Sequence, residues 1–179
     1  MKSTDLKLEI NDKRGNLNTN PLLGFFRTVF LFLSLRVKFF KEDAGRMITM
    51  QDGKTFRVFR HVRIRASGSS GPGGVFVVRF RPKNMTVEQN IRFSLLPMMI
   101  FMGFHGFREK YWCVDDETGL CQGVYAWQTV QDAENYSKSI AMRFMTKRSD
   151  PESVSARVID QKFETFIGKL KLPQQKQRI

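Results

Sequence analysis

The spacing of hydrophobic residues alternates between a period of two and a helical period, and it predicts six elements in the region 75–161. Four stretches rich in β-branched and aromatic residues, or alternating with period two, predict strands at 75–81, 107–114, 120–128 and 153–159. Thr86 and Thr129 can each cap a helix, and apolar residues at helical spacing follow both. The first helix would run to Met102, with Pro97 kinking or breaking it. The order βαββαβ is that of the ferredoxin-like α+β fold.

A helix and a hairpin are predicted ahead of this unit, in residues 21–65. The Asn20-Pro21 pair marks a helix start, and the segment 22–40 is dense in Leu, Phe and Val. Its longest run without a charge is eight residues, from Thr28 to Leu35. A bilayer span needs about 20. The segment is therefore expected to be an amphipathic helix that either lies in the plane of a membrane or packs on protein.

The hairpin is predicted from residues 47–50 and 55–65, because the Asp52-Gly53 pair between them is a strong two-residue turn signal. In the second strand apolar residues alternate with polar ones, and Phe59 and Arg60 break the alternation. One face of the strand would be apolar and the other a row of positive charge. That row is either solvated or in contact with lipid phosphates.

Composition divides the chain into five parts: a tail (1–20), the helix and hairpin (21–65), a Gly/Ser-rich linker (66–74), the βαββαβ domain (75–161) and a basic amphipathic tail (162–179). In the last part Phe163, Phe166, Ile167 and Leu170 have helical spacing. This short helix either docks on the domain or touches lipid.

The net charge of +13 is concentrated at the two ends of the chain. Lys and Arg exceed Asp and Glu by 8 in residues 1–74, by 1 in residues 75–161 and by 4 in residues 162–179. A neutral domain between basic ends indicates attachment to an anionic surface, such as the inner face of the cytoplasmic membrane. The start of the chain lacks the pattern of a secretion signal, so a cytoplasmic location is expected.

Nucleic acid is disfavoured as a partner. RNA-recognition domains share the βαββαβ order, but they stack bases on aromatic residues at fixed places in a central strand. In the matching stretch, Gln122 replaces the basic residue, and Tyr125 and Trp127 fall one place late. A shift of one place in a strand moves a side chain to the opposite face.

Several patterns of glycine and aromatic residues indicate a family. They are GFREKYW at 106–112, GVYAW at 123–127 and SARVID at 155–160, with the helix opened by Thr129. Together they resemble a monooxygenase family related to the antibiotic-biosynthesis monooxygenases. The resemblance implies a homodimer in which two sheets meet face to face as a dimeric α+β barrel, with a pocket between each sheet and its own helices. Some relatives oxidise aromatic polyketides without a metal or flavin, while others have no established activity.

Such an oxidation needs an apolar pocket and a group that takes a proton, so that the resulting carbanion reacts with oxygen. His105, in the loop before a strand, is the candidate catalytic base, with a solvent-facing loop residue as the alternative. The candidate substrate-binding residues would line the pocket or fill the core: Phe76, Phe80, Met98, Met102, Tyr111, Trp112, Tyr125 and Trp127.

No metal and no cofactor is expected. The sequence contains no glycine-rich phosphate loop and no cluster of residues with metal-ligand spacing. Some related enzymes degrade haem with an Asn on the first strand and a His on the second helix. Residues 75–81 lack Asn and residues 129–145 lack His, which argues against haem degradation.

Pairing the central strands about Glu117 sets Glu109 opposite Tyr125, Tyr111 opposite Gly123 and Cys113 opposite Cys121. The two cysteines would then be close enough for a cross-strand disulfide. Two reduced thiols are the alternative that a cytosolic location favours.

The function expected from these features is that of a cofactor-independent monooxygenase-like protein. It would act on a hydrophobic or aromatic small molecule at the membrane periphery. The alternative is a non-catalytic, membrane-associated binding or assembly protein that uses the barrel as a dimerisation module. Whether the chain is an enzyme stays open at this point, because few polar candidates for the pocket are found in the sequence.

Overall fold

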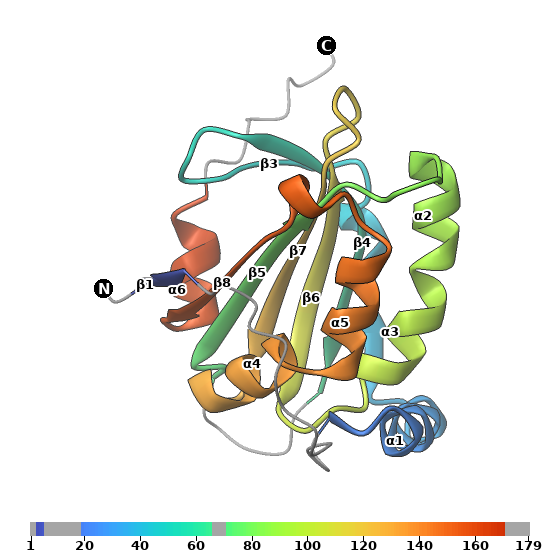
Figure 1. Ribbon diagram of the computed structural model, residues 1–179. Helices are drawn as coiled ribbons and strands as arrows, with labels where there is room; N and C mark the ends of the chain where they lie inside the picture. The colour runs from blue at the N-terminus through green and yellow to red at the C-terminus, as the bar shows by residue number, and fades with distance from the viewer. Residues whose placement is uncertain (1–2, 6–18, 66–70, 171–179) are drawn as a thin grey trace.

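A computed structural model describes residues 3–5, 19–65 and 71–170, and within these ranges the chain forms one antiparallel sheet flanked by helices (Figure 1). The strands are β1 (Ser3–Asp5), β2 (Val37–Phe39), β3 (Met47–Thr49), β4 (Thr55–Ile64), β5 (Gly74–Phe80), β6 (Phe107–Val114), β7 (Cys121–Trp127) and β8 (Ser155–Asp160). The helices are α1 (Pro21–Leu33), α2 (Val87–Phe93), α3 (Leu95–Phe101), α4 (Val130–Ser137), α5 (Ile140–Lys147) and α6 (Phe163–Gly168), with 3-10 turns at Lys41–Asp43 and Pro151–Ser153.

The centre of the sheet has the ferredoxin-like arrangement that the sequence predicts. The strands lie in the order β1-β8-β5-β7-β6-β4-β2, and β3 pairs with β4. Strands β5, β6, β7 and β8 are joined as βαββαβ, with helices after β5 and after β7. Adjacent strands run antiparallel throughout this unit. The fold class is therefore α+β and ferredoxin-like.

The predicted hairpin forms and extends this same sheet. β3 and β4 pair on either side of Gly53, whose φ of +82° is the left-handed backbone of the turn. β4 then pairs along β6, so the 21–65 segment contributes strands to the sheet of the 75–161 domain. A register shift lies between Val58 and Arg60, at the point where the sequence alternation breaks.

The first helix is shorter than predicted. α1 ends at Leu33, and Val37–Phe39 form β2 on the edge of β4 instead of continuing the helix to residue 40. The Ser34 hydroxyl donates to the carbonyl of Phe30, and Leu35 takes a φ of 54°, so the chain reverses there. The unpaired edge of β4 offers the Val37–Phe39 backbone partners that an isolated helix end lacks.

Both predicted helices of the domain are divided in two. Thr86 caps α2 in a capping box with Gln89, but the helix breaks at Ser94 before α3 begins. Pro97 explains the position, because it has no N–H to donate to the carbonyl one turn earlier. Thr129 caps α4, and Ser139 caps α5 by accepting from the Met142 N–H. Because Ser139 starts a new helix, the single helix expected after Thr129 is divided into α4 and α5.

Each face of the sheet carries its own apolar core. One core lies under α3, α4 and α5 and includes Phe76, Trp127 and Tyr136. The other lies under α6 and the β3–β4 hairpin and includes Val77 and Val124. Phe163, Phe166 and Leu170 are buried in the second core, so the predicted C-terminal helix docks on the domain. Residues 171–179 of the predicted tail lie outside the described residues.

The face that a dimeric barrel would use is covered within one chain. Val75, Val77 and Val124 on that face are at most 3% exposed. The homodimer stays a prediction. The linker prediction falls mostly on 66–70, outside the described residues, and Gly74 already belongs to β5. Within the predicted tail, Ser3–Asp5 pair with the open edge of β8.

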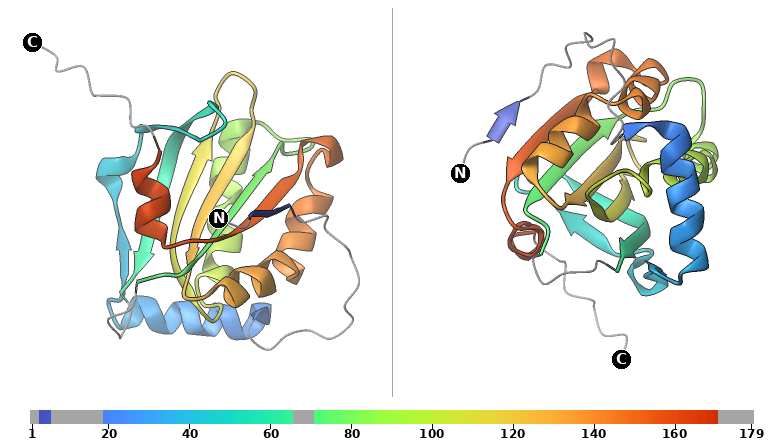
Figure 2. Two further views of the ribbon diagram at one scale, coloured as in Figure 1. Left: turned by 90° about the vertical axis from the view of Figure 1, so that its left-hand side faces the viewer. Right: turned by 90° about the horizontal axis from the view of Figure 1, so that it is seen from below.

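Two views place α1 across one end of the molecule, beyond the ends of the strands (Figures 1 and 2). Its contact is with α3, where Gly24 and Gly103 allow the two backbones to approach closely. A Cβ atom on Gly103 would overlap the backbone of Gly24. Among the described residues, no helix has the length and apolarity to cross a membrane.

Candidate functional site

An apolar cavity of about 90 Å³ lies between the helices α2, α3 and α5 and the sheet face formed by β5, β6 and β7. Its aromatic walls include Phe80, Phe101, Trp112, Tyr125, Tyr136, Phe93 and Phe144. Lys110 from the middle of β6 also reaches it. A charged side chain in such surroundings is the feature of this cavity that needs a physical account.

The Lys110 amine is held by aromatic groups. Its Nζ donates to the Tyr125 hydroxyl oxygen over 2.6 Å. It lies 4.0 Å from the centre of the Tyr125 ring, 4.2 Å from that of Trp112 and 4.3 Å from that of Phe101. Among the described residues no carboxylate forms an ion pair with it. The amine is therefore buried without a countercharge.

Burial lowers the pKa of Lys110 well below its ordinary value of 10.5, and the nearby positive charge of Arg60 lowers it further. The Arg60 guanidinium donates to the Ser94 hydroxyl and to the carbonyl of Ile91, and it does not line the cavity. It repels the proton on Lys110 without offering a hydrogen bond to a ligand. Burial and the charge of Arg60 therefore both favour the uncharged form of the amine, which can accept a proton.

Tyr125 and Tyr136 extend the polar contact of Lys110 into a short chain. The Tyr136 hydroxyl donates to the Tyr125 oxygen over 3.0 Å. Burial raises the pKa of both phenols, so they stay protonated. If Lys110 is charged, the Tyr125 oxygen accepts twice and its own proton lacks an acceptor. If Lys110 is uncharged, its lone pair can accept that proton, so that both phenol protons have an acceptor.

The turn between β6 and β7 decides which side chains reach the cavity. Asp115 donates its N–H to the carbonyl of Leu120, and Gly119 takes a φ of 68°. This four-residue loop shifts the pairing by one residue from the expected register. Lys110, not Glu109, lies opposite Tyr125, and Trp112 lies opposite Gly123. The side chains from Glu109 to Val114 are therefore on the face opposite to the expected one, whereas Phe107, before a register shift, still pairs with Trp127 as expected.

The same shift excludes the cross-strand disulfide. Cys113 pairs with Gln122 and Cys121 with Val114, and both thiols are free. Cys113 belongs to the core under α6, whereas Cys121 accepts from the Asn90 side chain on the cavity side. Burial raises the pKa of each thiol to about 12, so neither is a nucleophile at neutral pH.

Aromatic side chains from two helices form the outer part of the cavity. Phe93 of α2 and Phe144 of α5 lie 6.3 Å apart between ring centres. The Arg148 guanidinium lies 3.7 Å from the centre of the Phe93 ring. Half of Phe144 is exposed, so this end of the cavity borders the solvent.

The structure brings three of the eight predicted substrate-binding residues to the cavity: Phe80, Trp112 and Tyr125. Phe76, Met98, Met102 and Trp127 are packed in the core on the same side of the sheet and do not line the cavity. Tyr111 lies on the opposite face, stacked on His61 with ring centres 3.8 Å apart. The shifted register accounts for its position.

His105 lies outside the cavity. Its side chain is 60% exposed, and its Nδ1 lies 2.9 Å from Asp132 Oδ1. The Asp132 carboxylate also accepts from the Thr129 hydroxyl, so it belongs to the start of α4. The catalytic role of His105 stays a prediction, but its hydrogen-bond partner Asp132 does not line the cavity.

The sequence reasoning missed Lys110, although a signal was present. Glu109 and Lys110 are consecutive in a central strand, and neighbouring residues of a strand point to opposite faces. One of the two charges therefore had to lie under the helices.

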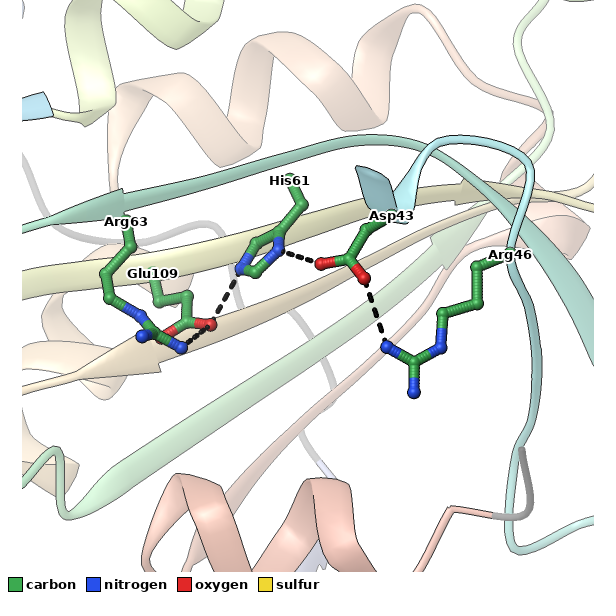
Figure 3. A network of polar contacts seen from close by, with 5 residues as sticks. All are labelled: Asp43, Arg46, His61, Arg63 and Glu109. Atoms are coloured by element: carbon green, nitrogen blue, oxygen red, sulfur yellow. Dashed lines mark hydrogen bonds and ion pairs between the residues drawn. The ribbon is translucent and has the colours of Figure 1, made fainter. Parts of the chain in front are cut away.

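A buried charge network occupies the opposite face of β4 and β6 (Figure 3). His61 Nδ1 lies 2.5 Å from Asp43, and its Nε2 lies 2.7 Å from Glu109. Arg63 donates to both oxygens of Glu109. Burial acts to raise the pKa of Glu109, but the hydrogen bonds from His61 and Arg63 outweigh it and hold this pKa below its ordinary value. The network joins the Lys41–Asp43 turn to the sheet.

Among the described residues no group of His, Cys, Asp and Glu is arranged to hold a metal ion. The polar side chains of the residues that line the cavity are an amine, a guanidinium, two phenols, an indole, amides, hydroxyls and thiols. With no carboxylate or imidazole among them, this set suits proton transfer better than metal binding.

Comparison with known proteins identifies no family for this chain. No family model and no curated protein matches the chain. Two solved structures from Listeria are similar to it. One, from Listeria monocytogenes, is an uncharacterised ferredoxin-fold protein related to antibiotic biosynthesis monooxygenases, with 10% identity and a TM-score of 0.47 over 60% of this chain and 64% of that one. The other, a monooxygenase-like protein from Listeria innocua, has 13% identity and a TM-score of 0.48 over 63% and 67%.

The match therefore spans about two thirds of each neighbour. With TM-scores below 0.5, the two similarities assign no function, and the function has to be argued from the cavity itself.

Proposed function

We propose that this protein is a cofactor-independent monooxygenase-like enzyme that binds a small hydrophobic or aromatic molecule in the Lys110 cavity. The observation that supports the proposal is a buried, basic amine without a countercharge, hydrogen-bonded to Tyr125 in an apolar space. An enzyme needs such a group to remove a proton from a weakly acidic carbon near neutral pH. In this proposal Lys110 takes the role that the sequence assigned to His105.

The proposed reaction begins when the Lys110 amine takes a proton from a methylene group flanked by electron-withdrawing rings. The carbanion passes electrons to dioxygen, the second reactant that the family resemblance implies, and a C–O bond forms. The second C–H proton then leaves the carbon as the O–O bond of the peroxide breaks. One oxygen stays as a carbonyl, and the other leaves with the two protons as water. Overall, CH₂ and O₂ give C=O and H₂O. The Tyr125–Tyr136 pair would stabilise the negative charge by hydrogen bonding.

The cavity of about 90 Å³ is smaller than the ~150 Å³ that admits benzene in an engineered protein core. A single small group fits as the cavity stands. For a ring system, the Phe93 and Phe144 side chains at the outer end would have to move apart. The proposal therefore places the reacting carbon near Lys110 and the rest of the substrate between these two rings.

Dioxygen uptake with a panel of anthrone-type and phenolic compounds tests the catalytic proposal. We expect Lys110→Met to reduce the turnover by about 10²–10⁴-fold, the usual contribution of a general base. His105→Ala is the control and should leave turnover unchanged, because His105 lies outside the cavity. Turnover that survives Lys110→Met would contradict the role of the amine. An absence of turnover with the whole panel would leave the binding function without catalysis.

We also propose that α1 attaches the protein to an anionic membrane surface, on the cytoplasmic side. Large hydrophobic residues are exposed along one helix at Leu22, Leu23, Phe25, Phe26, Phe30 and Leu33. Arg27, Lys38 and Lys41 lie in or near this segment and match anionic headgroups. The helix lies across an end of the molecule, so a flat surface can reach it (Figure 2). The same surface favours the second candidate function, a membrane-associated binding protein without catalysis.

Flotation of the protein with anionic phosphatidylserine vesicles tests this attachment. The double variant Phe26→Asp/Phe30→Asp should float at least about tenfold less, since burial of one phenylalanine contributes roughly 1.5–3 kcal/mol. Phe26 is 61% and Phe30 64% exposed, so the fold should tolerate both changes. Ile140→Asp on α5 is the matched control, because Ile140 is 48% exposed. Equal flotation of the two variants would rule out α1 as the attachment.

A further inference from the structure

Lys110 has the surroundings of a lysine that acts as a nucleophile. Lysines that attack carbonyl carbons are activated by an apolar pocket or by a second positive charge, because both favour the uncharged amine. Lys110 has both, in the aromatic walls and in Arg60. The described residues offer no carboxylate that would fix it as an ammonium ion. In the proposed oxidation Lys110 acts only as a base. Its surroundings also suit a second role, as a nucleophile.

We infer that the cavity accepts a small aldehyde or ketone and that Lys110 captures its carbonyl carbon as an imine. The inference rests on the proposed function, since it assumes that the cavity holds a small hydrophobic molecule. It names the substrate class more narrowly, as a carbonyl compound. Imine formation occupies the same Nζ that acts as the base in the proposed oxidation, so the two reactions are alternatives at one nitrogen.

The step balances with the groups that are present. Lys110 Nζ forms a bond to the carbonyl carbon, and the π electrons of C=O move to oxygen. Two protons leave the nitrogen and the oxygen departs as water, while a C=N bond forms. Tyr125, 2.6 Å from Nζ, can give its proton to the departing oxygen and recover one from nitrogen. The Tyr136 hydroxyl stabilises the Tyr125 oxygen during this transfer.

The cavity selects for short, weakly polar carbonyl compounds. About 90 Å³ holds a chain of a few carbon atoms next to Lys110. Arg60 is occupied by Ser94 and Ile91 and does not line the cavity. The Arg148 guanidinium, which does line it, is stacked on Phe93 at the outer end. A neutral carbonyl group needs only the amine and the phenol.

Reductive trapping tests the inference on the full-length protein. Butanal and cyanoborohydride at pH 7 should label Lys110 at least tenfold faster than exposed lysines. At this pH an ordinary lysine amine is uncharged in only about one molecule in 10³. Peptide mass mapping locates the label. Lys138→Met, a change at an exposed lysine, should leave the labelling of Lys110 unaltered. Tyr125→Phe should slow it by about 10²-fold if the phenol transfers the proton.

Binding of butan-1-ol, which has the same shape but no carbonyl carbon, separates the two proposals. Quenching of Trp112 fluorescence reports occupancy, because Trp112 lines the cavity. Fast labelling of Lys110 supports the inference. Butanol binding with Lys110 labelled no faster than Lys138 overturns the imine and leaves the cavity as a binding site. Neither binding nor labelling overturns the imine and the proposed function together.

Discussion

Replacing His61 with alanine should lower the free energy of unfolding by about 3–5 kcal/mol, the usual cost of removing one partner from a buried ion pair. The variant leaves Asp43 and Glu109 facing a space that the imidazole filled. It also empties the gap between the Phe40 and Tyr111 rings, whose centres lie 4.3 Å and 3.8 Å from the imidazole. Urea unfolding at pH 7, followed by circular dichroism, measures the loss.

Arg46→Ala is the matched control for this network. Arg46 pairs with the same Asp43, but its side chain is 43% exposed, so the change should cost under about 1 kcal/mol. If His61→Ala and Arg46→Ala destabilise the protein equally, the network is no more than a set of solvated surface pairs. Glu109 adds a pH dependence. Its pKa is lowered in the folded protein, so its stabilising contribution should disappear as the pH falls through that lowered pKa.

Lys110→Met should have the opposite effect and stabilise the protein by roughly 1–3 kcal/mol at pH 7, because it removes a buried polar group with too few partners. The gain should depend on pH. The folded protein favours the uncharged amine, so between the lowered pKa and the ordinary value of 10.5 unfolding takes up a proton. Wild-type stability therefore rises with pH across this window. Below the lowered pKa, Lys110 is charged in the folded protein, and the buried charge lowers the free energy of unfolding by its full amount.

Thermal unfolding of the wild type and Lys110→Met from pH 6 to pH 10 measures this difference. The two melting temperatures should converge as the pH approaches the upper end of the window. Lys138→Met, a change at an exposed lysine, serves as the control, so its pH dependence should follow that of the wild type. A constant difference between wild type and Lys110→Met over the whole range would show that the amine does not change its charge within it.

The sequence predicted the strands β3 to β8 because their signals are local, whereas β1 lies in a predicted tail and β2 in a predicted helix. β6 begins and ends at the predicted residues, and the broken alternation at Phe59 and Arg60 marks a real register shift. The helix ends were less predictable. The stop at Ser34, the reversal at Leu35 and the new start at Ser139 depend on where the chain meets the edge of β4 and on which hydroxyl finds a free N–H.

The candidate site depended on one residue of register, which no periodicity determines. A loop centred on Glu117 would place Glu109 against Tyr125, whereas the observed loop places Lys110 there. The aromatic walls of the cavity were predicted in part, because the candidates included both Tyr111 and Trp112 of β6, together with Tyr125 of β7. Trp112 and Tyr125 line the cavity. The basic group was not predicted, because the register of the strand decides whether Glu109 or Lys110 faces the cavity.

The α6 helix and the β3–β4 hairpin give the second sheet face a cover from within the chain. A protein that relies on another subunit to shield such a face ties its folding to protein concentration. Here the shield is covalently attached, at the high effective concentration of a tethered segment. Covering this sheet face is therefore a unimolecular event, and dilution of the protein does not uncover it.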